Sequence, residues 1–540
     1  MKRHVRVMLF VFELGGIVGA ISLLPAHFTS KKAANLITPN AVLAAPPNLP
    51  FSEPGRLALL VPGLQIRAYQ LANNCTLYAA PNGIGNDTNS GTSPTSPTTL
   101  TGADGATSLG SVVCLLGGRY ELSDSWTVKS SGASGSSVTF QAYGDGPVNI
   151  VWTHTAADSH AMILISGTYN GSSFSGPQNL IFQGLNLDGG IGNAALGGTV
   201  GGGAANGFQC NQSKGIAFIA NTVSNTGGAG ISAVQCDYVT SDHNLIFHDG
   251  YNNGAAGYSP TSGITYSQIA TADTYTGLHN VISNNIVVGE VDQTTAHTDG
   301  NGIIFDLAYG SNTTTPPGLI INNIVYGNGG RCVETNQYMT NFWIVNNSCY
   351  KNDLDTTESG FGGIVHNFPS GISNVGGFVL NNISYSWAAT NPPYQQLNAP
   401  SNPGVNYFAD LYYGAACSPS SLCTGFINAD PQFVLPPYFD PSATGQYNVG
   451  RPPLPGRPNY RSTTMCAVSG TQAWISTCDI DSGFALASTS PGYGNVGVDP
   501  TTLTSDPNLK ADLGAFVYND INGNPRGGTT GKWDLGALTH

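Results

Sequence analysis

Charged residues are scarce in this 540-residue chain, where Lys, Arg, Asp and Glu together make up only 9%. The 18 basic residues are outnumbered by 31 acidic ones and form no cluster beyond the first few residues. Because a protein needs a basic patch to neutralise phosphates, this balance excludes nucleic acids as a partner. A polyanionic substrate would need a local basic site or bound cations. With 70 Gly and few ions, the composition is that of an exported β-rich protein.

Several catalytic motifs and a second long apolar run are also absent. The sequence has no H-E-x-x-H, no G-x-S-x-G and no phosphate-binding P-loop. The Gly-rich residues 197–203 lack a flanking strand and helix, so we interpret them as a loop. Beyond residue 24, no segment is long and apolar enough to cross a membrane.

The first residues have the order of an export signal. Lys2, Arg3 and Arg6 precede an apolar run over residues 7–24, and small residues follow. We predict a signal peptide within residues 1–45. The run is close to the length of a membrane span, so a retained N-terminal anchor is the alternative. Either way the protein is expected to be secreted or held at the cell surface.

Ten cysteines fall into five pairs that are close in sequence. An even number in an exported chain favours disulfides. Cys210 and Cys236 could equally be buried thiols. The expected pairs are Cys75 with Cys114, Cys210 with Cys236, Cys332 with Cys349, Cys417 with Cys423, and Cys466 with Cys478.

The most informative feature is a phrase that recurs along the middle of the chain. Each copy has a few β-branched or aromatic residues, an Asn corner and a second short apolar run, which predicts a strand, a sharp corner and a strand. Consecutive corners lie 23 to 41 residues apart, as expected for coils of a solenoid that carry loops. The corners are predicted at Asn221, Asn244, Asn285, Asn323, Asn347 and Asn382.

Further phrases occur in the order found in bacterial pectate-lyase-like right-handed parallel β-helix proteins, which the chain resembles. The phrases are residues 76–97, 112–120, 138–146, 299–306, 328–334, 428–434 and 512–516. The resemblance implies an all-β fold, a right-handed parallel β-helix over residues 75–400. Residues 401–540 are expected to form an irregular closing region, and residues 100–110 a short cap at the other end.

The repeat also predicts a functional corner. Residues 302–306, 332–336 and 363–367 should lie side by side, with alternate side chains pointing outward. This gathers charge where the chain otherwise avoids it, which favours a functional site. The alternative is that Arg331 ties two coils together by pairing with Asp299 or Glu334. The solvent-facing patch is predicted to contain Arg331, Asp299, Asn301, Asp306 and Glu334.

The resemblance implies a carbohydrate-active protein, most simply a lyase that acts on a uronate-containing polysaccharide. Arg331 would abstract the proton, and Asp299, Asp306 and Glu334 would hold calcium, the one cofactor suggested. The substrate would be bound by Asn301, His297, Asn336 and His366. A hydrolase using two of the carboxylates as acid and base is one alternative. A non-catalytic, glycan-binding surface or matrix protein is another, and the chain is expected to be a monomer.

A second, weaker candidate corner contains neighbouring histidines and carboxylates. Asp242 and His243 precede one predicted turn, and His248 and Asp249 precede the next. Glu290 and Asp292 lie one coil further on. Polar turn residues of this kind are more often solvated loops than sites.

Overall fold

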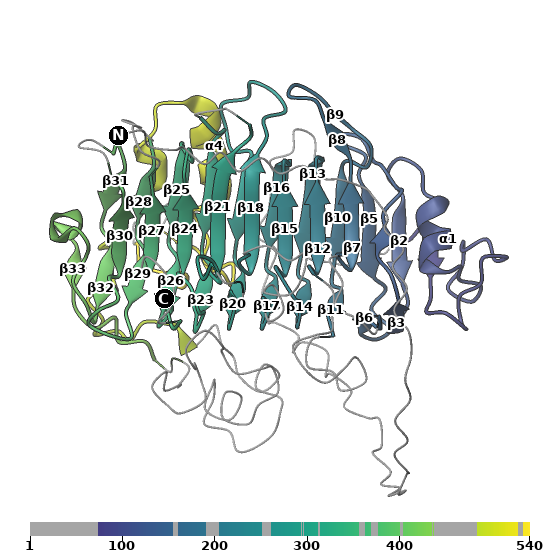
Figure 1. Cartoon of the computed structure of the whole chain (residues 1–540), viewed down its shortest axis with the longest axis horizontal. Helices are drawn as coiled ribbons and strands as arrows, with labels where there is room; N and C mark the ends of the chain where they lie inside the picture. The colour runs from purple at the N-terminus through teal and green to yellow at the C-terminus, as the bar shows by residue number, and fades with distance from the viewer. Residues whose placement is uncertain are drawn as a thin grey trace, which may run out of the picture. The chain divides into compact units, whose positions relative to one another are not determined.

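The computed structural model describes residues 74–154, 160–190, 205–250, 261–292, 294, 296–310, 314–355, 362–368, 376–399, 403–434, 436, 483–526 and 533–539. Three long parallel sheets dominate these residues, with 11, 11 and 9 strands (Figure 1). Along most of the chain, successive strands of these sheets belong to different sheets, and each strand pairs with its equivalent one coil later. This arrangement is the predicted right-handed parallel β-helix. The predicted signal or anchor and the pair Cys466–Cys478 lie outside the described residues.

Sheet 1 contains the strands that precede one corner of each coil, and in six coils this corner holds a predicted asparagine. In sheet order they are β1 (Leu77–Ala79), β2 (Val112–Leu115), β5 (Val138–Ala142), β10 (Leu180–Gln183), β13 (Lys214–Ile219), β16 (Asp237–Asp242), β19 (Asn280–Ser283), β22 (Gly318–Ile321), β25 (Phe342–Val345), β28 (Phe378–Leu380) and β31 (Asn406–Phe408).

Sheet 2 begins directly after that corner. Its strands are β3 (Gly118–Leu122), β6 (Val148–Trp152), β11 (Asn186–Asp188), β14 (Thr222–Ser224), β17 (Leu245–Phe247), β20 (Ile286–Val288), β23 (Ile324–Tyr326), β26 (Ser348–Tyr350), β29 (Ile383–Tyr385), β32 (Leu411–Tyr413) and β33 (Ile427–Asn428). The coils therefore continue past the predicted boundary at residue 400.

Sheet 3 completes each coil and carries the strands of the candidate site. They are β4 (Trp126–Thr127), β7 (Ile163–Ser166), β12 (Phe208–Asn211), β15 (Ile231–Val234), β18 (Ile264–Ile269), β21 (Ile303–Ala308), β24 (Val333–Asn336), β27 (Ile364–Asn367) and β30 (Tyr394–Leu397). The remaining elements are the hairpin β8 (Thr168–Tyr169) and β9 (Phe174–Ser175), the helices α1 (Leu100–Gly105) and α4 (Pro507–Phe516), and the 3₁₀ turns η2 (Ser420–Cys423) and η3 (Pro500–Thr502).

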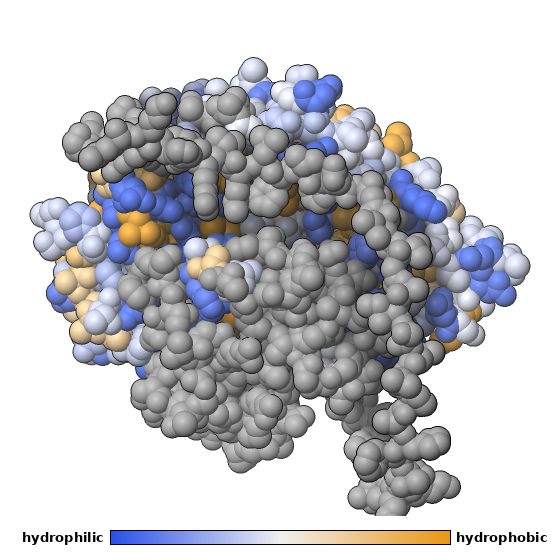
Figure 2. Space-filling model, viewed as in Figure 1, coloured by the Kyte–Doolittle hydropathy of each residue, from blue (hydrophilic) through white to orange (hydrophobic). Residues whose placement is uncertain are grey.

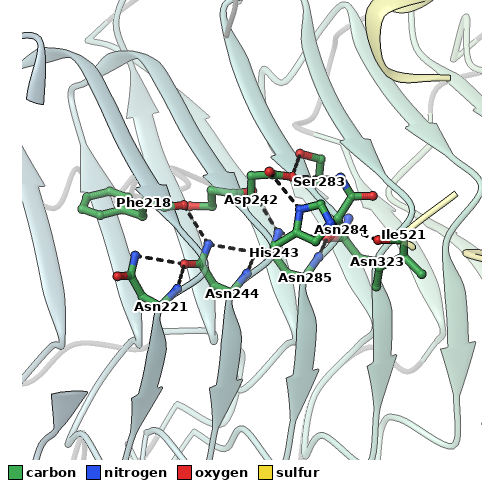
Figure 3. A network of polar contacts seen from close by, with 11 residues as sticks. Phe218, Asn221, Asp242, His243, Asn244, Ser283, Asn284, Asn285, Asn323 and Ile521 are labelled. Atoms are coloured by element: carbon green, nitrogen blue, oxygen red, sulfur yellow. Dashed lines mark hydrogen bonds and ion pairs between the residues drawn. The ribbon is translucent and has the colours of Figure 1, made fainter. Parts of the chain in front are cut away.

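A continuous ladder of asparagine side chains runs along the corner between sheets 1 and 2 (Figure 3). Asn285 is typical. Its Oδ1 accepts hydrogen bonds from the backbone and side-chain nitrogens of Asn244, both at 2.9 Å. Its Nδ2 donates to Ser241 O at 2.9 Å and to Asn323 Oδ1 at 3.0 Å. The same pattern joins all six predicted corners, so the predicted register is confirmed.

The two residues of each Asn-Asn pair have different structural roles. The first turns the chain in the left-handed region, as at Asn284, where φ is 57°, and at Asn322, where φ is 56°. Asparagine tolerates this conformation better than most residues. The second residue forms the ladder. At the far end Asp410 replaces the next asparagine and accepts the hydrogen bond of the Asn382 backbone nitrogen at 2.6 Å.

The inside of the coils is a column of stacked apolar side chains. Strand alternation turns Ile282, Ile320 and Ile344 of sheet 1 inward, and each is fully buried. Burying one such side chain is worth about 1.5–3 kcal/mol. Helix α1 covers the N-terminal end by inserting Leu100 and Ala103 into this core, which confirms the short cap.

The C-terminal residues close the solenoid and also run back along its sides. The disulfide Cys417–Cys423 joins the core at the last coil. Helix α4 packs Leu513 and Phe516 against the outer side of sheet 1, and Phe484 and Ile521 pack against the outer side of sheet 2. On the described part of the face shown in Figure 2, hydrophobic residues form small separate patches among hydrophilic ones.

Four disulfides link neighbouring parts of the solenoid. They join Cys75 with Cys114, Cys210 with Cys236, Cys332 with Cys349, and Cys417 with Cys423. Four of the five predicted pairs are therefore confirmed, and Cys210 and Cys236 are bonded rather than free. Within the described residues, none of the helices is both long and apolar enough to cross a membrane.

Candidate active site at the corner before sheet 3

Acidic residues gather where three successive coils pass from sheet 2 to sheet 3. The loop between β20 and β21 contains Asp292, His297, Asp299 and Asn301. The equivalent loop of the next coil contains Arg331. The strands that follow add two carboxylates from the outer face of sheet 3, Asp306 and Glu334, and the third loop adds Asp353 and Asp355.

The strand register at this corner is the one predicted from the repeat. Ile303 pairs with Val333, Ile304 with Glu334, and Asp306 with Asn336. Val333 in turn pairs with Ile364, and Asn336 with Asn367. Asp306 and Glu334 therefore leave the same face of sheet 3 from neighbouring strands.

Arg331 is buried, with only 2% of its surface exposed. Its Nη1 donates to Thr298 O at 2.6 Å and to Glu334 Oε2 at 3.3 Å. Its backbone nitrogen donates to Asn301 Oδ1 at 2.8 Å. These bonds join the two coils, so the prediction that Arg331 faces solvent is wrong, and its position favours the structural tie over the proton-abstracting base.

We expect Arg331→Ala to lower the free energy of unfolding by about 3 kcal/mol, because Glu334 would keep a buried charge without its partner. Chemical denaturation followed by tryptophan fluorescence would measure the loss. Arg119→Ala is the matched control, since Arg119 pairs with Glu121 at the surface and an exposed pair contributes less than about 1 kcal/mol. If the two variants were equally stable, the buried contacts of Arg331 would contribute no more to stability than the exposed Arg119–Glu121 pair.

Asn301 and Glu334 are also buried parts of this tie, with exposures of 0% and 4%. Asn301 Nδ2 donates to Ser262 Oγ and to Glu334 Oε2, both at 3.0 Å. Burial raises the pKa of Glu334, against the lowering effect of Arg331. The predicted solvent-facing patch therefore lies largely beneath the surface, and Asn301 supports the site from below.

Asp299 is the carboxyl of this site that no other described side chain engages by a hydrogen bond. It is half-buried, and its carboxylate accepts no hydrogen bond from any described residue. Burial raises its pKa well above the ordinary value, and the negative charges of Glu334, Asp306 and Asp292 raise it further. Asp299 therefore keeps its proton at a pH at which an ordinary aspartate has lost it.

Asp306 is half-buried and held by two donors. Asn336 Nδ2 donates to its Oδ1 at 2.7 Å, and Ser267 Oγ donates to its Oδ2 at 3.0 Å. Burial raises its pKa, and these two hydrogen bonds oppose the rise. Asn336 also accepts from Asn367 Nδ2 at 2.9 Å, so it lies in an outward-facing amide row as well as beside the site.

His297 forms a short contact with the loop of the third coil. Its Nδ1 lies 3.0 Å from Asp355 Oδ2. The side chain of His297 is 21% exposed, whereas that of Asp355 is 6% exposed. Sequence reasoning missed Asp353 and Asp355, although both directly follow the Lys351–Asn352 end of a repeat and so occupy the equivalent corner.

His366 points into the solenoid, so its predicted contact with substrate is contradicted by its position. It is 1% exposed, stacks on Phe342 and shares a 2.7 Å hydrogen bond with Thr335 Oγ1. Burial lowers its pKa to about 3. The reason is strand alternation: His366 pairs with Thr335, one position away from the outward column.

The second candidate corner divides between two places. Asp242 and His243 lie beside the asparagine ladder, where His243 contacts Ile521 of the C-terminal region (Figure 3). Asp249 and Glu290 instead belong to the corner before sheet 3. There they are buried in a stacked column, with the Asp249 backbone nitrogen donating to Glu290 Oε2 at 3.2 Å.

The predicted calcium ligands do not form a cation cage. Across the residues that the structure describes, no group of three or more His, Cys, Asp or Glu side chains is placed to hold a metal ion. Glu334 is engaged by Arg331 and Asn301, and Asp306 by Asn336 and Ser267. We therefore derive no chemical step through a metal.

No protein-family model and no curated protein matches the sequence. A pectate lyase structure matches with 16% identity, covering 87% of this chain and 97% of that one at a TM-score of 0.43. An alginate lyase from Paenibacillus sp. matches with 13% identity, 61% and 95% coverage and a TM-score of 0.40. A surface adhesin of Streptococcus pneumoniae matches with 12% identity, 62% and 75% coverage and a TM-score of 0.38. These likenesses concern the fold alone and assign no activity.

Proposed function

We propose that the protein is an exported carbohydrate-active enzyme that hydrolyses a polysaccharide at the corner before sheet 3, with Asp299 as its general acid. The proposal rests on one observation. Asp299 is a half-buried carboxyl whose pKa is raised by burial and by three neighbouring carboxylates, and its side-chain oxygens accept no hydrogen bond from any described residue. A raised carboxyl pKa is what a general acid requires near neutral pH.

The chemistry follows from the charges around Asp299. Its proton would pass to the glycosidic oxygen as the bond to the anomeric carbon breaks. Positive charge then develops on the sugar ring, as in the oxocarbenium-like transition state of glycoside hydrolysis. Asp306, on the outer face of sheet 3, would stabilise that charge when ionised, a form that its hydrogen bonds from Asn336 and Ser267 favour.

The charge of the site also favours a glycan without carboxylates. Arg331 lies beside three acidic residues, Asp299, Glu334 and Asp353, and its guanidinium is already engaged inside the protein. A uronate polymer would meet excess negative charge there, with no exposed basic partner among these residues. A neutral polysaccharide avoids that repulsion.

The uronate lyase expected from the resemblance predicts a different product. A lyase leaves an unsaturated sugar that absorbs ultraviolet light, whereas a hydrolase releases reducing ends without it. The burial of Arg331 gives no support to its role as the proton-abstracting base. Export is supported by the order of residues 1–45 and by the four disulfides, which persist in oxidising compartments.

The test is to incubate the purified protein with neutral and uronate polysaccharides and to measure reducing ends and ultraviolet absorbance together. We expect reducing ends from a neutral polymer, and a loss of about 10²–10³-fold in kcat for Asp299→Asn, because the amide cannot donate the proton in the same way. Glu121→Gln, a surface carboxylate on β3, is the control and should keep wild-type activity.

Two results would contradict the proposal. Full activity of Asp299→Asn would show that Asp299 is not the general acid. An unsaturated product from a uronate polymer would show that the reaction is β-elimination and not hydrolysis. Inhibition of that activity by a chelator would support the predicted calcium.

A further inference from the structure

The described residues include three Asp–His pairs that share one geometry. In each, Nδ1 of the histidine lies within 3.0 Å of a carboxylate oxygen, in the pairs His243–Asp242, His279–Asp237 and His297–Asp355. An ionised carboxylate can only accept a hydrogen bond, so Nδ1 carries a proton in all three pairs. The pairs differ in what the second ring nitrogen contacts.

In two of the pairs the second nitrogen is already used by the fold. His243 Nε2 lies 2.9 Å from Ile521 O, and this contact attaches the C-terminal region to the asparagine corner (Figure 3). His279 Nε2 lies 3.0 Å from Tyr275 O, and the His279 side chain is fully buried. Both histidines therefore bridge segments of the chain.

His297 is the exception. Its Nε2 makes no hydrogen bond to any residue that the structure describes, and its side chain is partly exposed while its partner Asp355 is nearly covered. With Nδ1 holding the proton, Nε2 presents a lone pair away from Asp355. His297 lies two residues before Asp299 in the same loop.

We infer that His297 is the general base of the proposed hydrolase and that Asp355 positions it. The inference rests on the proposed function. His297 Nε2 takes a proton from water as the water oxygen bonds to the anomeric carbon. The glycosidic bond breaks, and its oxygen takes the proton of Asp299. One proton is gained by the base and one is lost by the acid, and solvent restores both groups afterwards.

The charged groups around His297 suit this role. Asp355 reaches it from the loop after β26, and Asp292 and Asp299 belong to its own loop. Arg331 approaches from the next coil, but it bonds Thr298 O and Glu334. The carboxylates would stabilise the imidazolium that forms when Nε2 takes the proton.

The first arm of the test needs no substrate. Nitrogen-15 NMR of the histidine rings at alkaline pH separates the two neutral tautomers. We expect His297 to be protonated at Nδ1 in the wild-type protein and to shift toward the Nε2–H form in Asp355→Asn. A wild-type His297 protonated at Nε2 would overturn the positioning role of Asp355.

The second arm uses the polymer that the wild type cleaves. His297→Gln should lower kcat by about 100-fold or more with KM changed less than about threefold. Asp355→Asn should lower kcat by roughly tenfold. His243→Gln is the matched control, because Nε2 of His243 is occupied by Ile521 O, and it should keep wild-type kcat.

The outcomes separate the two proposals. An inactive Asp299→Asn together with a fully active His297→Gln would show that His297 is not the general base, while the proposed hydrolase activity would stand. A wild-type protein that cleaves no polysaccharide would overturn the hydrolase and the base together. In that event the NMR arm alone decides whether Asp355 fixes the ring of His297.

Discussion

Asn285→Ala should lower the free energy of unfolding by roughly 3 to 6 kcal/mol, because each buried polar group left without a partner costs about 1–3 kcal/mol. The side chain of Asn285 is fully buried and makes four hydrogen bonds, to Asn244, Ser241 and Asn323. Truncation leaves the Asn244 backbone nitrogen and Ser241 O unpaired inside the protein and adds a small cavity. Urea denaturation followed by circular dichroism would measure the change.

Asn398→Ala is the matched control for this experiment. Asn398 ends the outward-facing amide row on sheet 3, where it is exposed and donates a single 3.0 Å bond to Asn367 Oδ1. Water replaces that partner, and alanine suits the φ of 54° at this position less well than asparagine, so we expect a loss of only about 1 kcal/mol. If Asn285→Ala unfolds at the same urea concentration as Asn398→Ala, the ladder does not hold the coils together.

Thermal stability should rise as the pH is lowered from about 8 to about 5, because several buried carboxyls hold protons only in the folded state. Burial raises the pKa of Asp249 to about 7 and that of Asp353 to about 7, and it raises the pKa of Glu290 as well. Between pH 4 and 7 the unfolded chain has lost these protons while the folded protein keeps them. Stability therefore falls as pH rises through this window, and levels off above it.

Asp249 alone can contribute up to about 4 kcal/mol of this dependence, at about 1.36 kcal/mol for each pKa unit above its ordinary value. His366 acts in the opposite direction, because its pKa is lowered to about 3 and the unfolded chain gains its proton first as the pH falls. The raised carboxyls are more numerous, so the net slope keeps the sign given above. Scanning calorimetry at several pH values would measure it.

Asp249→Asn should stabilise the protein at pH 8 by roughly 1–3 kcal/mol and flatten the pH dependence, since it removes a buried charge and keeps the shape. The Thr226 backbone nitrogen now donates to Asp249 Oδ1 at 2.8 Å, and an amide oxygen can accept the same bond. Glu121→Gln removes an exposed carboxylate and should change neither quantity. A destabilised Asp249→Asn with an unchanged pH slope would show that Asp249 is ionised and paired in the fold.

The solenoid and its register could be predicted from the sequence because each coil repeats one local rule. An Asn corner followed by a short β-branched run fixes where a strand starts and which side chains point inward. That rule placed Glu334 beside Ile304 and Asp306 beside Asn336, as the structure has them. It also placed Asp299 and Arg331 at the same corner, although it did not show how far each side chain is buried.

Only the tertiary structure decided what the site contains. Arg331 is bonded to Thr298 of one coil and to Glu334 of the next, and the pKa of Asp299 is raised first by burial and then by the charges of nearby carboxylates. His297 lies 58 residues from Asp355, and although the repeat places both at equivalent corners, it does not show that their side chains meet. Strand order and facing follow from local periodicity, so the sequence by itself determined them. Burial, charge and hydrogen bonding at one point arise from segments that only the folded solenoid brings together.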